Sequence, residues 1–334
     1  MFTGPRCKLA FPAAAVVVLC LGHARTTHAA VTFRTVALTG DAAPGTDPGV
    51  TFKSFRKGVS LNGLGQTVFQ AVLQGPGVDS TNANGLWSEG SGALNLVARQ
   101  GNHAPGTEPG VVFEFLSTAT LNDTGHVAFR GSLTGPGIDS ANDSGIWWNG
   151  TGALAQVARA GGSAPDTGPG VVFTGFGDFA FNNNDSFAFG ERITGPGVDD
   201  TNNVGIWSGP SDDLRLVVRR GDPAPGFGAG TSFSTVQIAP GMGQAGQVGW
   251  TAELVGPEID STNNESLWSG LPSSINLVAR IGDQAPDIEA GKLFTSLNLP
   301  KVNALGEMVF LAGVTTTRGI DAGIWSQAAG RCNW

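Results

Sequence analysis

Acidic and amide side chains recur in the sequence at a spacing that could bind a cation or a polar ligand. In four loops that begin with Gly-Pro, an Asp is followed three residues later by an Asn: Asp79 and Asn82, Asp139 and Asn142, Asp199 and Asn202, Asp260 and Asn263. Oxygen-rich loops of this kind can coordinate Ca²⁺, but the same residue types also form Asx turns that satisfy their own backbone. Three alternatives therefore stay open for these loops: a structural turn, a calcium site and direct contact with a ligand. We expect no other cofactor.

Arginine and tryptophan recur in phase with these loops. The arginines end one strand candidate in four of the five units, at Arg99, Arg159, Arg219 and Arg280. The tryptophans recur once in each unit, in four cases after Gly and one further residue, at Trp87, Trp147, Trp207, Trp268 and Trp325. We expect the arginines to form ion pairs between units or hydrogen bonds to loop carbonyls, with ligand binding as the alternative. We expect the tryptophans to pack in the core. Trp148 lies outside the column and is predicted to be an exposed stacking surface.

Signs of catalysis are sparse in the sequence. After removal of a predicted signal peptide only His103 and His126 remain as histidines, too few for a zinc site of the usual His/Cys kind, and no G-x-S-x-G motif is present. Glycoside hydrolysis needs only two carboxylates about 5–10 Å apart. Five acids do not recur between units and could supply such a pair: Glu114, Asp178, Asp185, Glu191 and Glu253. We predict no catalytic site and keep a glycoside hydrolase as the alternative.

The units that position these residues are tandem repeats. Three aromatic columns recur in phase, once in each unit: Phe52, Phe113, Phe173, Phe233 and Phe294; Phe69, Phe129, Phe189, Trp250 and Phe310; and the five tryptophans above. Self-similarity at a fixed period of this length is typical of solenoids, propellers and arrays. The repeats run approximately over positions 46–101, 106–161, 166–221, 226–282 and 287–326, the last completed by positions 31–45.

Each unit contains four strand candidates and no helical periodicity. In the second unit they cover positions 112–121, 126–133, 145–148 and 153–159, which we call strands a, b, c and d. Short Asn/Gly links join a to b and c to d, as in β-hairpins. Four antiparallel strands per repeat are typical of a propeller blade. The sequence therefore predicts an all-β, five-bladed β-propeller as one domain over positions 31–334.

The two ends of the repeat array predict how the ring closes. Residues 36–45 read like a strand d and the loop after it, whereas the last unit ends after its strand c at Trp325. We expect this N-terminal d strand to pair with the C-terminal a, b and c strands and complete the fifth blade. A closed ring would leave no unpaired sheet edge.

The start of the chain, positions 1–30, has the pattern of a secretory signal peptide. Arg6 and Lys8 precede an apolar stretch over positions 9–21, which is too short to span a bilayer, and the small residues Ala29-Ala30 follow. Removing three of the 19 basic residues with this segment leaves 16 against 27 acidic ones, a net charge of −11. We therefore predict a secreted protein, extracellular or held in the periplasm or at a cell surface, that neither binds nucleic acid nor inserts in a membrane after signal cleavage.

The repeat motifs resemble those of a known family. N-x-x-G-x-V-A-F, G-I-W and V-A-R-x-G-D-x-A-P-G are similar to the motifs of secreted bacterial tandem-repeat proteins of unknown function, and the likeness covers positions 31–326. The resemblance implies a repeated β fold and export. It carries no catalytic residues that could be transferred to this chain.

The loop lengths predict which face of the blades carries function. The a–b and c–d links are tight turns, whereas the b–c and d–a links are long and emerge together on the opposite side. Binding residues are found on such loops because a rigid scaffold positions them. We therefore expect an extracellular glycan or protein to bind at the long-loop face.

Overall fold

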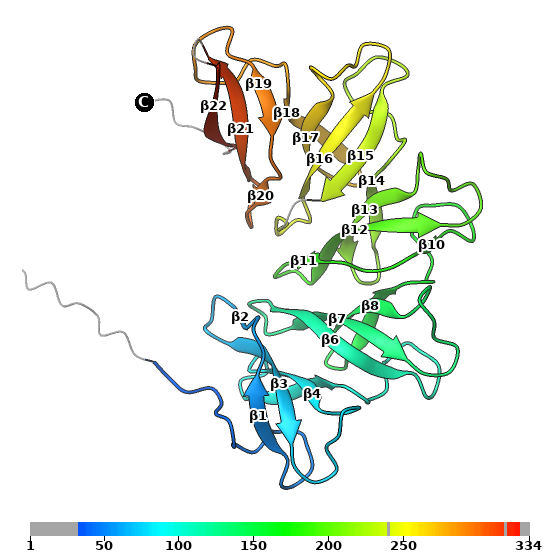
Figure 1. Ribbon diagram of the computed structural model, residues 1–334, viewed down its shortest axis with the longest axis vertical. Coiled ribbons are helices and arrows are strands. Elements are labelled where there is room, and N and C mark those ends of the chain that lie inside the picture. The colour runs from blue at the N-terminus through cyan, green and yellow to red at the C-terminus, as the bar shows by residue number, and fades with distance from the viewer. Residues whose placement is uncertain (1–32, 239–240, 317–318, 328–334) are drawn as a thin grey trace, which may run out of the picture. The chain divides into compact units, whose positions relative to one another are not determined.

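The structure of the protein is a computed structural model that describes residues 33–238, 241–316 and 319–327 (Figure 1). Its strands form five antiparallel sheets within a unit that runs from Ala37 to the C-terminus. Helix is absent from the described ranges, and so is any helical segment long and apolar enough to cross a membrane. The predicted signal peptide lies outside the described residues. The all-β architecture of repeated antiparallel sheets is confirmed.

Sheets 1 to 4 each use the strands of one repeat in the order a, b, c, d, and sheet 5 contains the strands a, b and c. Sheet 1 contains β1 (Thr51–Phe55), β3 (Thr67–Gln74), β4 (Asn84–Ser88) and β5 (Asn95–Arg99), with β2 (Ser60–Leu61) also on β3; sheet 2 contains β6 (Val112–Leu121), β7 (Val127–Thr134), β8 (Ser144–Trp148) and β9 (Ala155–Arg159). Sheet 3 contains β10 (Val172–Phe173), β12 (Ser186–Thr194), β13 (Val204–Pro210) and β14 (Arg215–Arg219), with β11 (Phe179–Phe181) on β12. Sheet 4 contains β15 (Ser232–Ile238), β16 (Val248–Val255), β17 (Glu265–Leu271) and β18 (Ser274–Arg280); sheet 5 contains β19 (Phe294–Leu297), β21 (Met308–Thr316) and β22 (Gly319–Ser326), with β20 (Lys301–Val302) on β21.

Sheet 5 does not contain the N-terminal d strand that the sequence predicts for it. Among the described residues β22 pairs with β21 alone, and residues 33–38 form no strand. The sheets are therefore not closed into a ring by strand pairing. Strand patterns identify each strand from its own residues, but a pairing between the two ends of a chain depends on long-range placement that no local pattern determines.

The core consists of aromatic residues from one sheet packed on aliphatic residues from the sheet before it. In sheet 3, Phe173 meets Trp207 edge-on at 4.9 Å between ring centroids, and Phe189 stacks on the same tryptophan at 6.4 Å. This triad packs against Ile146 and Ala158 of sheet 2. The same arrangement joins sheets 1 and 2, 3 and 4, and 4 and 5. Strand alternation places both sets of residues correctly, since successive side chains point to opposite faces.

A ladder of asparagines joins the a–b turns of successive sheets. Asn62 Nδ2 donates to the carbonyl of Asn122 at 2.8 Å, Asn122 Nδ2 to that of Asn182 at 3.1 Å, and Asn182 Nδ2 to that of Gly243 at 2.9 Å. Each of the three asparagines also accepts hydrogen bonds from its own turn through Oδ1. In the first three repeats one residue therefore both shapes its turn and binds the next sheet.

The packing between sheets predicts a contrast between two tryptophans of the same column. Trp207→Ala should lower the free energy of unfolding by about 3–5 kcal/mol, because a fully buried indole leaves a cavity between two sheets. Trp325→Ala should have a smaller effect, because Trp325 is only partly buried on sheet 5. Urea denaturation of both variants measures the difference. Equal losses would contradict the described packing.

Candidate functional site

The four predicted Asp–Asn loops form closely similar turns. In the first, Asp79 Oδ1 accepts from the backbone N–H of Thr81 at 2.8 Å and from its hydroxyl at 2.6 Å, and Asn82 Oδ1 accepts from Asp79 N at 3.0 Å. The equivalent bonds form in the loops of Asp199 and Asp260, and the loop of Asp139 lacks only the hydroxyl bond. The geometry is that of an Asx turn.

The loop carboxylates are already occupied by these internal hydrogen bonds. The Thr hydroxyl and then the Thr backbone N–H hold the pKa of three of them, Asp79, Asp199 and Asp260, below the usual range. Within the described ranges, no three His, Cys, Asp or Glu side chains are grouped so that they could hold a metal ion. Calcium binding by these loops stays a prediction, and the geometry gives a sufficient structural reason for their residue pattern.

Two of the four recurring arginines contact the b–c loop of their own sheet. Arg99 Nε donates to the carbonyl of Asn82 at 2.8 Å, and Arg219 Nε donates to that of Asn202. Arg280 instead lies 3.5 Å from Asp283 and 5.1 Å from the ring centroid of Phe227. Arg159 lines a cavity of about 490 Å³ beside Asp213 and Arg215. Two of the arginines thus hold the b–c loop through a carbonyl.

The tryptophans of the column lie in the core in sheets 1 to 4. Trp87, Trp147, Trp207 and Trp268 are fully buried. The prediction that Trp148 is an exposed stacking surface is wrong, because its side chain is only 8% exposed. Trp148 points to the opposite face of β8 from its neighbour, and this face is covered by sheet 3, where Trp148 meets Phe187 edge-on at 6.2 Å.

A cavity of about 890 Å³ lies among sheets 3, 4 and 5. We call it the three-sheet cavity. It is lined by charged side chains (Glu191, Arg192, Arg220, Glu253 and Glu265), by hydroxyl and amide side chains (Thr174, Ser234, Thr235, Gln237, Thr251, Ser266 and Asn298) and by a few apolar residues. Its lining residues lie mostly on β12, β15, β16 and β17 and not in the Asp–Asn loops. The cavity lies at the ends of β12, β16 and β17 that adjoin the long b–c loops.

Glu191 places a carboxyl where the other repeats have a small side chain. Its column otherwise contains Ala71, Gly131, Ala252 and Ala312, all of them buried. Burial raises the pKa of Glu191 to about 7. Hydrogen bonds from the backbone N–H groups of Gly177 and Arg192 and the positive charge of Arg130 lower this pKa, but burial has the larger effect. The Gly177 bond to Oε1 is 2.6 Å long. The carboxyl therefore changes its protonation near neutral pH.

Two further acids lie side by side on neighbouring strands of the cavity wall. Glu253 on β16 is directly paired with Glu265 on β17 in the strand register, so their side chains project from the same side of the sheet. Glu265 Oε2 lies 3.5 Å from the backbone N–H of Leu297 in sheet 5. Arg192 and Arg220 supply positive charge to the same cavity. The cavity thus offers both hydrogen-bond acceptors and charged donors.

Sequence reasoning found part of this site. Glu191 and Glu253 were among the five non-recurring acids, and the structure brings these two into one cavity. Glu114 and Asp178 are exposed elsewhere, and Asp185 lies at the a–b turns. Glu265, Arg192 and Arg220 were missed, because the residue type at each of these positions varies from repeat to repeat and no pattern marks them. Of the predicted loop residues, Asn263 lines a separate cavity of about 500 Å³ with Arg280.

The pKa of Glu191 predicts how stability depends on pH. The folded carboxyl keeps its proton up to about pH 7, whereas the unfolded one loses it near 4.5. The folded state therefore binds more protons in this window, and stability should fall as the pH rises through it. The Glu191→Gln variant has no proton to lose in this range. At about pH 8 its free energy of unfolding should therefore exceed that of the native protein by on the order of 2–3 kcal/mol.

Urea denaturation between pH 4.5 and about pH 8 measures this difference, which should be small at the acid end. Glu253→Gln, at an exposed acid of the same cavity, serves as the control and should keep the native pH profile. Identical profiles for the native protein and Glu191→Gln would contradict the buried setting of Glu191.

No match to a curated protein was found. An oligogalacturonate lyase in complex with manganese is similar in structure, with a TM-score of 0.40 and 12% identity over 86% of this chain and 67% of the other. The polysaccharide lyase Uly1 gives a TM-score of 0.37 and 11% identity over 91% and 64%. A family model matches residues 24–162 and 117–331, which together cover most of the sequence. The chain therefore belongs to DUF7453, a family of unknown function.

Proposed function

We propose that this protein is secreted and binds an extracellular glycan in the three-sheet cavity. The observation that carries the proposal is the carboxyl of Glu191, placed at a buried column where every other repeat has Ala or Gly. A polar group buried at such a position is unfavourable for stability and is retained where it has a function. The predicted signal peptide and the net charge of −11 support an extracellular role without nucleic acid.

The chemistry of the cavity wall suits a ligand with many hydroxyl groups. Carboxylates such as Glu253 and Glu265 accept hydrogen bonds from hydroxyls, and the guanidinium groups of Arg192 and Arg220 donate them. Binding sites of this size commonly enclose most of a small ligand. The cavity opens beside the long b–c loops, the side predicted to carry function, so a longer glycan could extend over them.

A second candidate function is hydrolysis of the bound glycan. Glu191, with its pKa raised to about 7, can hold a proton for a leaving group at neutral pH, and the same cavity contains the unlike carboxyl of Glu253. Carboxyl groups in contrasting environments are the usual acid and base of glycosidases. Binding needs only the lining described, whereas hydrolysis also needs a suitable separation of the two carboxyls.

A glycan array tests the proposed function. The native protein should bind a restricted set of glycans, and a double variant, Glu253→Gln with Glu265→Gln, should bind them at least about tenfold more weakly because two acceptors are lost. Glu114→Gln, which replaces an exposed acid of sheet 2 outside the cavity, is the matched control and should bind like the native protein.

Each glycan that binds is then incubated with the protein and assayed for new reducing ends. Cleavage that disappears in Glu191→Gln would establish the hydrolase, and binding without cleavage would support the first proposal alone. A blank array, or full binding by the double variant, would contradict a glycan site in this cavity.

We further propose that the five sheets are blades of one propeller and that residues near Ala37 pair with β22. The support is exposed apolar surface on sheet 5. Ile324 is 75% exposed, whereas its counterparts in the other repeats (Leu86, Ile146, Ile206 and Leu267) are fully buried. Val309 and Leu311 of β21 are exposed as well. An apolar face and an unpaired strand edge are normally covered, and a d strand would cover this edge.

A designed disulfide tests the closure. In sheet 1 Leu86 pairs with Ala98, and the equivalent residues at the proposed closure are Ile324 and Ala37. With the native cysteines replaced by serine, Ala37→Cys and Ile324→Cys should form an intramolecular disulfide under mild oxidation, because opposite residues of paired strands lie within bonding reach. Ala37→Cys with Ile320→Cys should not. Exclusively intermolecular disulfides would contradict closure within one chain.

A further inference from the structure

One a–b turn departs from the repeat at the position where glycine is expected. Gly65, Gly125, Gly246 and Gly306 end the other four turns with φ between 76° and 91°, and Asp185 takes this place in sheet 3 with φ of 56°. A residue with a side chain is unfavourable in this left-handed conformation by roughly 1 kcal/mol. Aspartate is one of the few residues besides Gly that adopt it, as Asp166 and Asp287 also do, and at this turn it adds a carboxylate.

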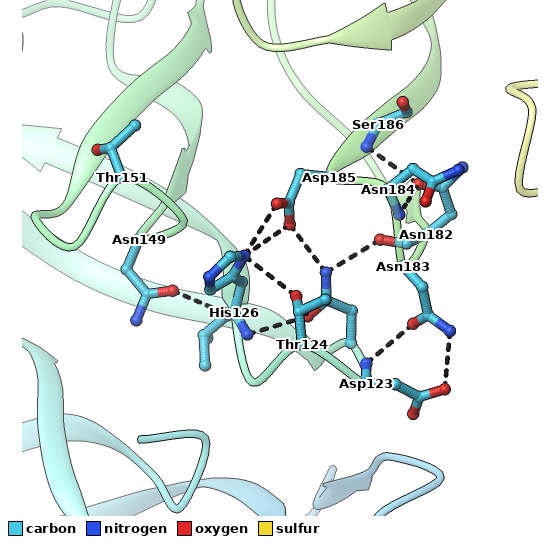
Figure 2. A network of polar contacts seen from close by, with 12 residues as sticks. Asp123, Thr124, His126, Asn149, Thr151, Asn182, Asn183, Asn184, Asp185 and Ser186 are labelled. Atoms are coloured by element: carbon cyan, nitrogen blue, oxygen red, sulfur yellow. Dashed lines mark hydrogen bonds and ion pairs between the residues drawn. The ribbon is translucent and has the colours of Figure 1, made fainter.

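The carboxylate of Asp185 reaches across to the neighbouring turn of sheet 2 (Figure 2). Both of its oxygens lie 2.9 Å from Nδ1 of His126, and Oδ1 also accepts from Asn122 Nδ2 at 2.8 Å. The hydroxyl of Thr124 lies 3.1 Å from the same ring nitrogen and donates its proton to Asn122 Oδ1. Every group around Nδ1 is thus an acceptor, so Nδ1 carries the proton.

In the neutral ring, a proton on Nδ1 leaves Nε2 of His126 as a hydrogen-bond acceptor. Figure 2 shows this second ring nitrogen on the side of the ring away from Asp185, toward Asn149 and Thr151. His126 lines a cavity of about 410 Å³ between the turn ends of sheets 1 and 2, which we call the short-turn cavity. The pairing with Asp185 therefore orients an acceptor toward open space.

The short-turn cavity has the lining of a site for a neutral ligand. Its polar side chains besides His126 are Ser88, Ser91, Asn95, Thr124 and Asn149, and it includes no Asp, Glu, Lys or Arg. Asn149 Oδ1 accepts a hydrogen bond from the N–H of Val127 at 2.7 Å, so the side-chain nitrogen of Asn149 is the group that can donate to a ligand. Leu96, Val97 and Leu154 add an apolar wall. Hydroxyl partners beside an apolar wall match the two faces of a sugar ring.

We propose that the short-turn cavity is a second binding site, which takes a neutral sugar with one hydroxyl donating to Nε2 of His126. Asp185 acts as a positioning residue, because it fixes the tautomer and the orientation of the ring. The site lies at the short turns, on the side of the sheets opposite the long loops, and does not depend on the glycan site of the three-sheet cavity.

A purely structural role for the pair would be to hold the turns of sheets 2 and 3 together. Other bonds already do this: Asn122 Nδ2 donates to the carbonyl of Asn182, and the N–H of Asp123 donates to Asn183 Oδ1 at 2.9 Å. The Asp185→Gly variant separates the two roles, since it restores the residue of the other repeats and relieves the backbone while removing the carboxylate.

The experiment uses the mature secreted protein with ¹⁵N-labelled histidine, in which His103 and His126 give separate imidazole signals. Methyl glucoside, methyl galactoside and N-acetylglucosamine are the probes, each titrated to about 50 mM. We expect Nδ1–H in native His126 and a saturable shift of its Nε2 signal with at least one probe, while His103 stays unchanged. Asp185→Gly should keep the melting temperature, lose the tautomer preference and bind about tenfold more weakly.

Glu191→Gln is the matched control for the other cavity and should leave the His126 titration unchanged. Glucuronate should bind more weakly than the neutral sugars, since the cavity offers no cationic partner. The proposal is overturned if no probe shifts Nε2, if native His126 carries its proton on Nε2, or if Asp185→Gly titrates like the native protein.

Discussion

The packing of each aromatic triad on the aliphatic face of the preceding sheet is the contact on which the rest of the structure depends. A single four-stranded sheet of about 60 residues buries too little surface to be stable alone. In sheets 2, 3 and 4 the triad buries a tryptophan and two further aromatic rings against the preceding sheet, and a fully buried large side chain contributes roughly 1.5–3 kcal/mol. The asparagine ladder then fixes the spacing at the turn ends.

A repeated scaffold makes its exceptions informative. The residue type that recurs at a position of the repeat indicates what the fold requires there. A residue that differs from an otherwise uniform position therefore points to a further role. Glu191 brings a carboxyl to a buried Ala or Gly column, and Asp185 brings one to a left-handed Gly position. Glu191 lines the cavity at the long-loop end of the sheets, and Asp185 contacts His126, which lines the cavity at the turn end.

The sequence could predict the strands because each is specified by its own residues. The aromatic columns, the Asn-x-x-Gly turns and the Gly-Pro loops all act over a few residues, and β6 to β9 lie where the pattern places them. It could not predict the lining of the three-sheet cavity, where Arg220 and Glu265 meet only through the packing of separate sheets. Trp148 was misjudged for the same reason, since the face that seemed free in one repeat is covered by the next.

The most direct test of this account is a crystal structure of the protein with a glycan that it binds. The account predicts sugar hydroxyls within hydrogen-bond distance of the Glu191 and Glu253 carboxyl groups, inside the cavity among sheets 3, 4 and 5. A glycan held by the Asp–Asn loops alone, with the cavity containing only water, would contradict it.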